Sequence, residues 1–259
     1  MKIINEQDFR RALYYDPHKS NTNKNFFRFK KEHKDTILRN LNDGELLLLI
    51  NLWIHNHIDK VYNLKNNDIN TIGLGNKKVE IYNSSLSPHL KKLRKNGLIE
   101  IKGRGKKRNI PYDYEKNNNF RNIPLSKVFN WLEVSKSPNH AGFRTYFYFL
   151  YRFYNEKNLS INDHGVRKLK ISASEISSAL SIPKNKNKTN SNHKLNITPE
   201  TARRHCNKIV NLGLLDVKKD NGNTNVYYLP FISTDYKIIT AKTIDKSEIP
   251  KSIIEKYQL

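Results

Sequence analysis

Two segments of this chain, 81–99 and 197–215, align with each other without a gap, and this internal repeat constrains the fold more than any other feature. In both segments, apolar residues recur at positions i, i+4 and i+7, which lie on one face of a helix. Each apolar series ends in a glycine, Gly97 or Gly213, followed by two apolar residues. Glycine ends helices well because it adopts a positive φ without a steric penalty. The repeat therefore predicts two amphipathic helices of the same design.

The pattern in the first half predicts two helices ahead of the repeated one and a hairpin behind it. Asn42 or Asp43 can cap a helix that continues to Ile58 and is apolar on most sides, which indicates a buried helix. The other predicted elements are a short helix over 66–74, the repeated helix over 84–96, and a hairpin with strands 98–101 and 110–114.

The second half repeats this order. An aromatic-rich helix over 143–154 keeps the i, i+3, i+4 spacing, so its aromatic row is interpreted as core rather than as a platform for stacking bases. Ser172 and Glu175 form the signature of a capping box, and Thr198 with Pro199 begins the repeated helix. The other predicted elements are a strand over 166–171, a helix over 172–180, and a hairpin with strands 214–217 and 224–229.

The segment from Ser84 to Ile99 resembles the recognition helix and first wing strand of winged helix-turn-helix proteins, and Thr198 to Leu215 is similar to it more loosely. The resemblance covers about 40–116 and 141–231. It implies a mainly α protein with small β wings (α+β), with two winged-helix domains in tandem. In that family the third helix enters the major groove and the wing touches the backbone or the minor groove. Tandem winged helices behind an N-terminal extension also resemble theta-type replication initiators of plasmids and phages, as well as winged-helix transcription regulators.

The repeat and the resemblance together predict how the chain is divided. A patch of Phe26, Phe27 and Phe29 is expected to dock on the first domain. The predicted parts are an N-terminal extension (1–39), a first winged-helix domain (40–116), a linker (117–140), a second winged-helix domain (141–232) and a C-terminal tail (233–259).

The charge of the chain points to a polyanionic partner. There are 47 Lys and Arg against 24 Asp and Glu, a formal net charge of +23, and such a surplus attracts nucleic acid. No apolar run is long enough to span a membrane, and we expect no secretory signal at the start. Because Cys206 is the only cysteine, a disulfide framework and a cysteine-based zinc cluster are excluded. We expect a DNA-binding protein of the cytoplasm or nucleoid, with no membrane partner.

Polar residues off the apolar face of each repeated helix are the candidate DNA contacts, because hydroxyl, Arg and Asn side chains pair with base edges while Lys and Arg fit phosphates. Arg203 and Arg204 are the best candidates for bidentate reading of guanine. In the first half the candidates are Ser84, Ser85, Ser87, His89, Lys91, Lys92 and Arg94. In the second half they are Thr198, Thr201, Arg203, Arg204 and Asn207.

Each predicted wing adds cations that can bind phosphates. The first wing carries five cations within 102–108, and those predicted to bind are Arg104, Lys106, Lys107 and Arg108. Lys218 and Lys219 are expected to do so more weakly in the second wing. A helix-turn-helix normally has a turn of three or four residues where this chain has the Lys- and Asn-rich insertion 183–196. We expect this insertion to be mobile, and either to fold onto phosphate or to disturb the docking of the helix behind it.

No catalytic residue, metal site or cofactor site is predicted. His55 and His57, with Tyr62 behind them, superficially resemble the site of rolling-circle nicking enzymes, but positions i and i+2 of a helix diverge by about 200°. The sequence also lacks a phosphate-binding loop of the GxxxxGK[ST] type. We therefore expect a binding protein rather than an enzyme.

Three functions remain in competition. The first is sequence-specific binding of duplex DNA at an operator or a replication origin; a regulator would act as a homodimer, and an initiator would recruit host replication proteins. The second is RNA or single-strand binding, for which single strands compete with duplex equally well. The third is a protein-interaction scaffold, which retards no nucleic acid.

Overall fold

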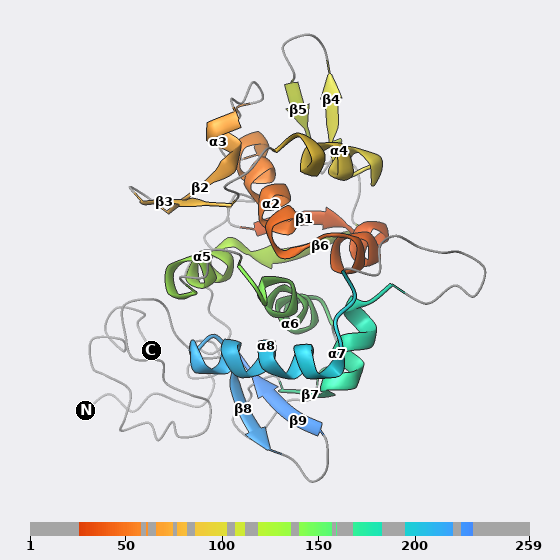
Figure 1. Cartoon of the computed structure of the whole chain (residues 1–259), viewed down its shortest axis with the longest axis vertical. Helices are drawn as coiled ribbons and strands as arrows, with labels where there is room; N and C mark the ends of the chain where they lie inside the picture. The colour runs from red at the N-terminus through yellow and green to blue at the C-terminus, as the bar shows by residue number, and fades with distance from the viewer. Residues whose placement is uncertain are drawn as a thin grey trace, which may run out of the picture.

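The computed structural model shows a mixed α+β protein elongated along one axis, with the elements of the first half towards one end and those of the second half towards the other (Figure 1). The residues that the structure describes are 26–57, 61, 66–74, 77–81, 86–102, 107–111, 119–135, 140–156, 159, 168–182, 195–219 and 224–229.

Two helices form the middle of the molecule, α2 (Asp43–His57) and α6 (Phe143–Asn155). Most residues of both helices are buried, as expected of helices that are apolar on nearly all sides. The aromatic row of α6 is confirmed as core, because Phe143, Tyr146, Phe147 and Leu150 are almost completely shielded from solvent.

The first half continues with α3 (Asn66–Asn70), the strands β2 (Thr71–Leu74) and β3 (Lys77–Glu80), α4 (Ser87–Lys95), and the hairpin β4 (Glu100–Lys102) and β5 (Lys107–Asn109). The predicted helix over 66–74 is wrong beyond Asn70, where the chain turns into a strand paired with β3. The side-chain amide of Asn51 on α2 donates to the carbonyls of Ile69 and Thr71, both at 3.0 Å, and so fixes this change from helix to strand.

The second half contains β7 (Lys168–Ser172), α7 (Ala173–Leu180), α8 (Pro199–Asn211), β8 (Asp216–Lys219) and β9 (Thr224–Tyr228). The three strands form one antiparallel sheet in the order β7–β9–β8. The predicted capping box at Ser172 and Glu175 is confirmed. Thr198 caps α8, since its hydroxyl accepts a hydrogen bond from the Thr201 amide at 3.1 Å.

Two segments outside the predicted domains are folded into the core. The strand β1 (Phe26–Lys30) pairs with β6 (Phe120–Pro124). Two short helical segments, Lys31–His33 and Thr36–Asn40, follow β1, and α5 (Leu125–Val134) follows β6. Phe27 and Phe29 each lie 6.0 Å from the Phe147 ring, measured between ring centroids. The part of 117–140 assigned to a linker therefore holds a strand and a helix, which corrects that assignment. Buried apolar residues of both halves belong to one continuous core.

None of the helices in the described residues is both long and apolar enough to cross a membrane.

Candidate nucleic-acid interface

The helices α4 and α8 end in the same backbone geometry. Gly97 has φ of 68° and Gly213 has φ of 69°. The Gly97 amide donates to Arg94 at 2.9 Å and the next amide to Leu93 at 3.1 Å. The corresponding bonds behind α8, from Gly213 and Leu214, measure 2.8 and 3.1 Å. The apolar positions i, i+4 and i+7 are buried in both halves: Leu86, Leu90 and Leu93 in the first, and Ala202, Cys206 and Ile209 in the second. The sequence repeat is therefore also a structural repeat.

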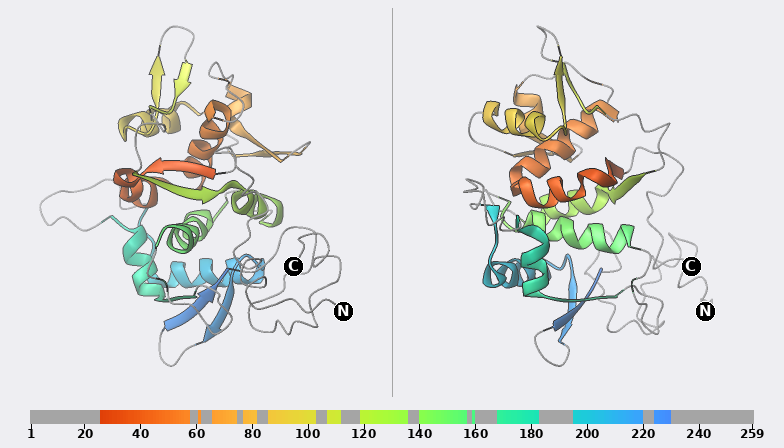
Figure 2. Two further views of the ribbon diagram at one scale, coloured as in Figure 1. Left: turned by 180° about the vertical axis from the view of Figure 1, so that it is seen from behind. Right: turned by 90° about the vertical axis from the view of Figure 1, so that its right-hand side faces the viewer.

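The two helices lie on the same side of the molecule, while the hairpins β4–β5 and β8–β9 lie at its opposite ends (Figures 1 and 2). Each hairpin directly follows its helix in the chain. The molecule therefore has two surface helices, each with its own hairpin, and the two hairpins point away from each other.

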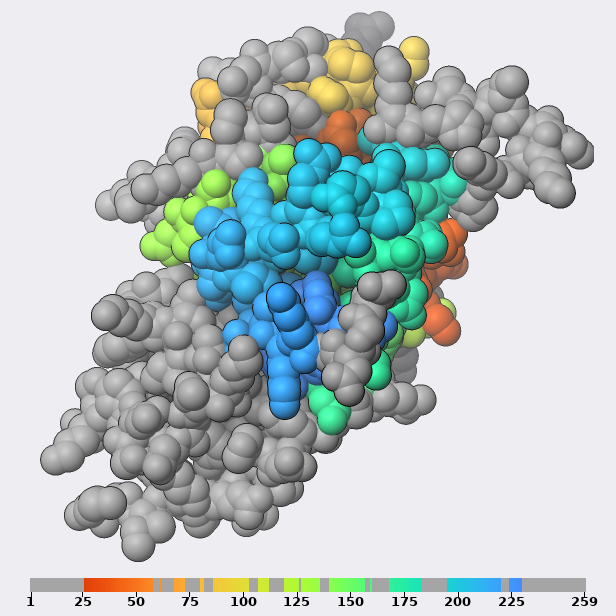
Figure 3. Space-filling model, turned by 60° about the horizontal axis from the view of Figure 1, so that its bottom comes forward, coloured from red at the N-terminus to blue at the C-terminus, as the bar shows by residue number. Residues whose placement is uncertain are grey.

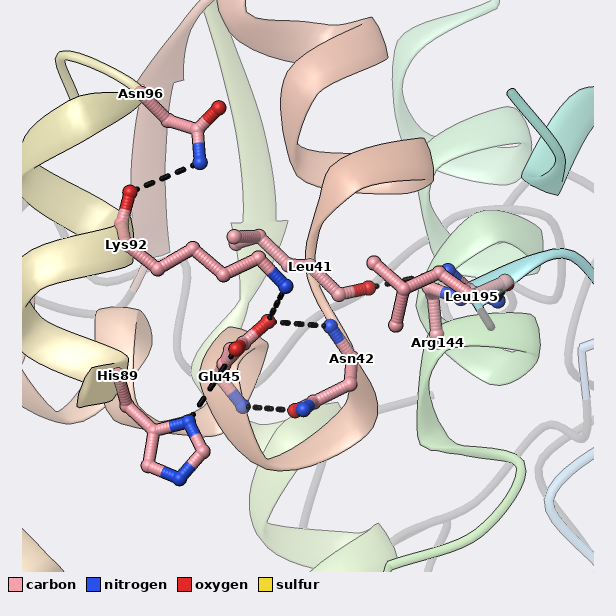
Figure 4. A network of polar contacts seen from close by, with 8 residues as sticks. All are labelled: Leu41, Asn42, Glu45, His89, Lys92, Asn96, Arg144 and Leu195. Atoms are coloured by element: carbon pink, nitrogen blue, oxygen red, sulfur yellow. Dashed lines mark hydrogen bonds and ion pairs between the residues drawn. The ribbon is translucent and has the colours of Figure 1, made fainter. Parts of the chain in front are cut away.

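The outer face of α4 is cationic. The side chains of Ser87, Lys91 and Arg94, all predicted DNA contacts, are exposed, as is Lys95. His89 and Lys92 instead contact α2: His89 Nδ1 lies 3.3 Å from Glu45 Oε1, and Lys92 Nζ lies 2.6 Å from Glu45 Oε2 (Figure 4). Both side chains are largely shielded, so their predicted place on the groove-facing side of the helix is corrected.

Glu45 is buried, with 3% of its surface exposed. It also takes part in capping the N-terminus of α2. The Asn42 amide donates to Glu45 Oε2 and the Glu45 amide donates to Asn42 Oδ1, both at 2.8 Å. This is a reciprocal capping box. Sequence analysis missed Glu45, although its spacing of three from Asn42, directly before a leucine run, is the usual signature of such a box.

The outer face of α8 carries polar groups of several kinds. Thr198, Arg203, Arg204 and Asn207 are exposed, and Figure 3 shows α8 and the second hairpin at the surface on one face of the molecule. The Arg203 side chain, 62% exposed, pairs with Glu200 at 2.5 Å. Arg204 donates to the Thr201 hydroxyl at 3.3 Å. These contacts place both guanidinium groups beside the first turn of α8.

The second half repeats the inward contacts with neutral partners. His205, which aligns with His89, has its Nδ1 3.0 Å from the Thr145 hydroxyl of α6. Lys208, which aligns with Lys92, donates to the Ala141 carbonyl at 2.8 Å and lies over the Trp131 ring. Burial lowers the pKa of His205, opposed by the nearby Asp43 carboxylate. In each half, a histidine and a lysine one turn apart tie the outer helix to the start of the central helix.

Two neighbouring cations of the first hairpin, Lys107 and Arg108, lie on opposite faces of their strand. Lys107 pairs across the hairpin with Lys102 and is exposed, whereas Arg108 pairs with Ile101 and is only 6% exposed. Successive residues of a strand point to opposite faces, so Arg108 turns towards the core, which corrects its predicted phosphate contact. Desolvation lowers its pKa. Asn56 of α2 holds this strand, donating to the Arg108 carbonyl at 3.1 Å and accepting from the Ile110 amide at 2.9 Å.

Other predicted contacts are exposed or lie outside the described residues. Lys218 and Lys219 are exposed on β8. Ser84, Ser85, Arg104, Lys106 and most of the insertion, 183–194, lie outside the described residues. The two ends of the insertion are joined directly: the Ile182 amide donates to Asn196 Oδ1 at 2.8 Å, and the Ser177 hydroxyl donates to the Ile197 carbonyl at 2.6 Å. These bonds hold α7 and the start of α8 together across the insertion.

Within the described ranges, His, Cys, Asp and Glu side chains form no group of three or more that could hold a metal ion. Cys206 is buried on the apolar face of α8, and burial raises its pKa to about 11. It therefore packs as a small apolar side chain. Comparison of the chain with protein-family models, curated protein sequences and solved structures found no match.

Proposed function

We propose that the chain is a non-catalytic, sequence-specific binder of double-stranded DNA, built from two winged-helix units in tandem, and that it acts at an operator or a replication origin. The single observation that carries this proposal is the repeated helix and hairpin: α4 and α8 lie on one side of the molecule, each anchored by its apolar face and each followed by an antiparallel hairpin.

The order of elements in the second half supports a winged-helix unit. Helix α6 is followed by a strand, two helices and two strands, and the first strand pairs with the last. The first half departs from this order, because the hairpin β2–β3 stands between its second and third helices. In both halves the third helix, α4 or α8, nevertheless lies at the surface and is followed in the chain by a hairpin.

The exposed groups suit a DNA groove. The major groove is about 12 Å wide and admits one α-helix. On α8, Arg203 and Arg204 are suited to guanine and Asn207 to adenine, while Lys91 and Arg94 on α4 are suited to phosphates. The net charge of +23 favours a strongly salt-dependent complex. Two helices on one side of the molecule allow one duplex to be read at two adjacent groove segments.

The test is selection of binding sites from a random duplex library, followed by gel retardation of the selected duplex. We expect one consensus with two half-sites, and competition by unrelated duplex weaker than competition by the selected site. Equal competition by single-stranded DNA or RNA would favour single-strand or RNA binding instead. No retardation of any nucleic acid would favour a protein-interaction scaffold.

A footprint on the DNA around the gene of this chain then separates the two biological roles. Protection of several repeated sites is expected of a replication initiator, whereas protection of one promoter operator by a dimer is expected of a transcription regulator.

A further inference from the structure

We infer that a continuous chain of polar contacts joins α4 to the segment just before α8, and that Glu45 and Arg144 within it are positioning residues that set the spacing at which the two half-sites are read. This inference rests on the proposed function. Figure 4 shows the chain of contacts running from Leu195, which precedes α8, through Arg144 and the peptide between Leu41 and Asn42 to Glu45 and α4.

The centre of the network is the peptide group between Leu41 and Asn42. Its carbonyl accepts a hydrogen bond from Arg144 Nη1 at 3.1 Å, and its amide donates to Glu45 Oε2 at 2.8 Å. One peptide group is therefore held between a guanidinium of the second half and a carboxylate of the first. Hydrogen bonds to charged groups are stronger than neutral ones, and bonds in a chain polarise one another.

The network reaches α4 through Glu45. Both carboxylate oxygens of Glu45 contact side chains of α4, Oε2 with Lys92 at 2.6 Å and Oε1 with His89 at 3.3 Å. Since His89 and Lys92 stand three residues apart on one face of the helix, the two contacts fix its rotation as well as its distance from α2. The face with Lys91 and Arg94 is then turned outward.

On the other side, Arg144 carries the network to the segment that leads into α8. Its Nη2 donates to the Leu195 carbonyl at 2.6 Å, three residues before the Thr198 cap. The Arg144 amide also donates to Asp43 Oδ1 at 2.6 Å. The N-cap of α6 is Gly142, which has no side chain to cap with. Asp43 of α2 therefore caps α6 from the other half, and the two central helices are joined at their N-terminal ends.

The burial of these charges indicates a positioning role. Glu45 is 3% exposed and Arg144 is 6% exposed. Burying an ion network is often no more stable than burying apolar side chains of similar volume, but directional bonds select one geometry. A spacing requirement needs such a selection, because the two half-sites lie at fixed positions on the duplex.

The first experiment measures the geometry without DNA. Spin labels are placed through Lys95→Cys and Asn211→Cys, which occupy aligned positions at the exposed ends of α4 and α8, in a Cys206→Ala background. Pulsed electron paramagnetic resonance then measures the distribution of distances between the two spin labels. We expect one narrow distribution in the parent protein and a broader one in both Arg144→Met and Glu45→Gln. Arg152→Met is the matched control, because Arg152 lies on the same helix and bonds to Tyr148 and Glu156, both in the second half.

The second experiment measures binding to duplexes in which one to three base pairs are inserted between the selected half-sites. We expect the parent protein to lose affinity about tenfold or more on each insertion, and Arg144→Met to lose less than about threefold, with unchanged base preference in each half-site. Arg152→Met is expected to keep the parent's spacing preference.

The two experiments separate the inference from the proposed function. If the distance distribution stays as narrow in Glu45→Gln as in the parent, the inference is overturned, and this variant decides the matter should Arg144→Met fail to fold. Broader distances with an unchanged spacing preference overturn the role in site reading. Broader distances in both variants, together with a parent protein that retards no duplex, leave the network standing and overturn the proposed function.

Discussion

The two halves of the molecule present the same helix in different ways. The outer face of α4 carries Lys91, Arg94 and Lys95, whereas that of α8 carries Arg203, Arg204 and Asn207 beside Glu200. Inside, α4 is held by the buried Glu45 carboxylate, and α8 by the Thr145 hydroxyl and the Ala141 carbonyl. The repeat thus preserves the backbone and the inward His and Lys, while the outer face and the polarity of the anchor have diverged. Within the proposed function, this difference assigns base reading to α8 and phosphate binding to α4, a division that the following variants test.

The largest expected effect concerns the two anchors. Glu45→Ala removes a helix cap and leaves His89 and Lys92 without their shared carboxylate, so we expect the free energy of unfolding to fall by about 3 kcal/mol. Thr145→Val, the matched change in α6, loses one neutral hydrogen bond, with an expected cost of about 1 kcal/mol. Urea unfolding of both variants measures the difference. Equal losses would show that the charged and neutral anchors are equivalent.

The next effect concerns base reading. If Arg203 makes the proposed bidentate contact to guanine, Arg203→Ala is expected to lower the discrimination at one base pair of the selected site by about 1–3 kcal/mol. Lys91→Ala on α4 is expected to weaken binding to all sequences alike. Affinities for single-base variants of the site measure both. A loss of base preference in Lys91→Ala as large as that in Arg203→Ala would contradict the division between the halves.

A smaller effect separates Lys91 from its neighbour Lys92. If Lys91 contacts one phosphate, Lys91→Met reduces the slope of log K against log salt by about 0.9. Lys92→Met is expected to leave this slope unchanged, because the Lys92 ammonium pairs with Glu45. Retardation assays across a salt series measure the slopes. A reduced slope in Lys92→Met would mean that this lysine leaves Glu45 when DNA binds.

Local patterns could be predicted from the sequence, whereas contacts between distant segments could not. The apolar faces of α4 and α8 and their glycine ends depend on neighbouring residues, and they were predicted correctly. The pairing of Phe26–Lys30 with Phe120–Pro124 joins segments far apart in the chain. Neither strand has a sequence pattern that identifies its partner. Likewise, helical spacing placed His89 and Lys92 off the apolar face but did not show that Glu45 approaches them from α2. Arg108 was misplaced because the returning strand was predicted to begin at Ile110, which left Arg108 in the turn, whereas β5 begins at Lys107.

The smallest effect is a pH dependence carried by histidines of the second half. His140 Nε2 donates to the Glu80 carbonyl at 3.0 Å, and burial lowers the pKa of His140 below its ordinary value of 6.5. A histidine with a lowered pKa binds more protons in the unfolded chain, so its contribution to stability is present above about pH 6.5 and is lost as the pH falls towards the folded pKa. Burial lowers the pKa of His205 with the same sign.

His140→Asn tests this contribution, because asparagine tolerates the positive φ of 50° at this position and has an amide that can replace the ring donor. We expect the variant to lose less free energy of unfolding than the parent protein between pH 7 and pH 5, and His205→Asn to behave in the same direction. Urea unfolding at a series of pH values measures both curves. Parallel curves for the parent and His140→Asn would show that this histidine is not kept neutral by burial, and that the junction between Glu80 and the start of α6 tolerates a charge.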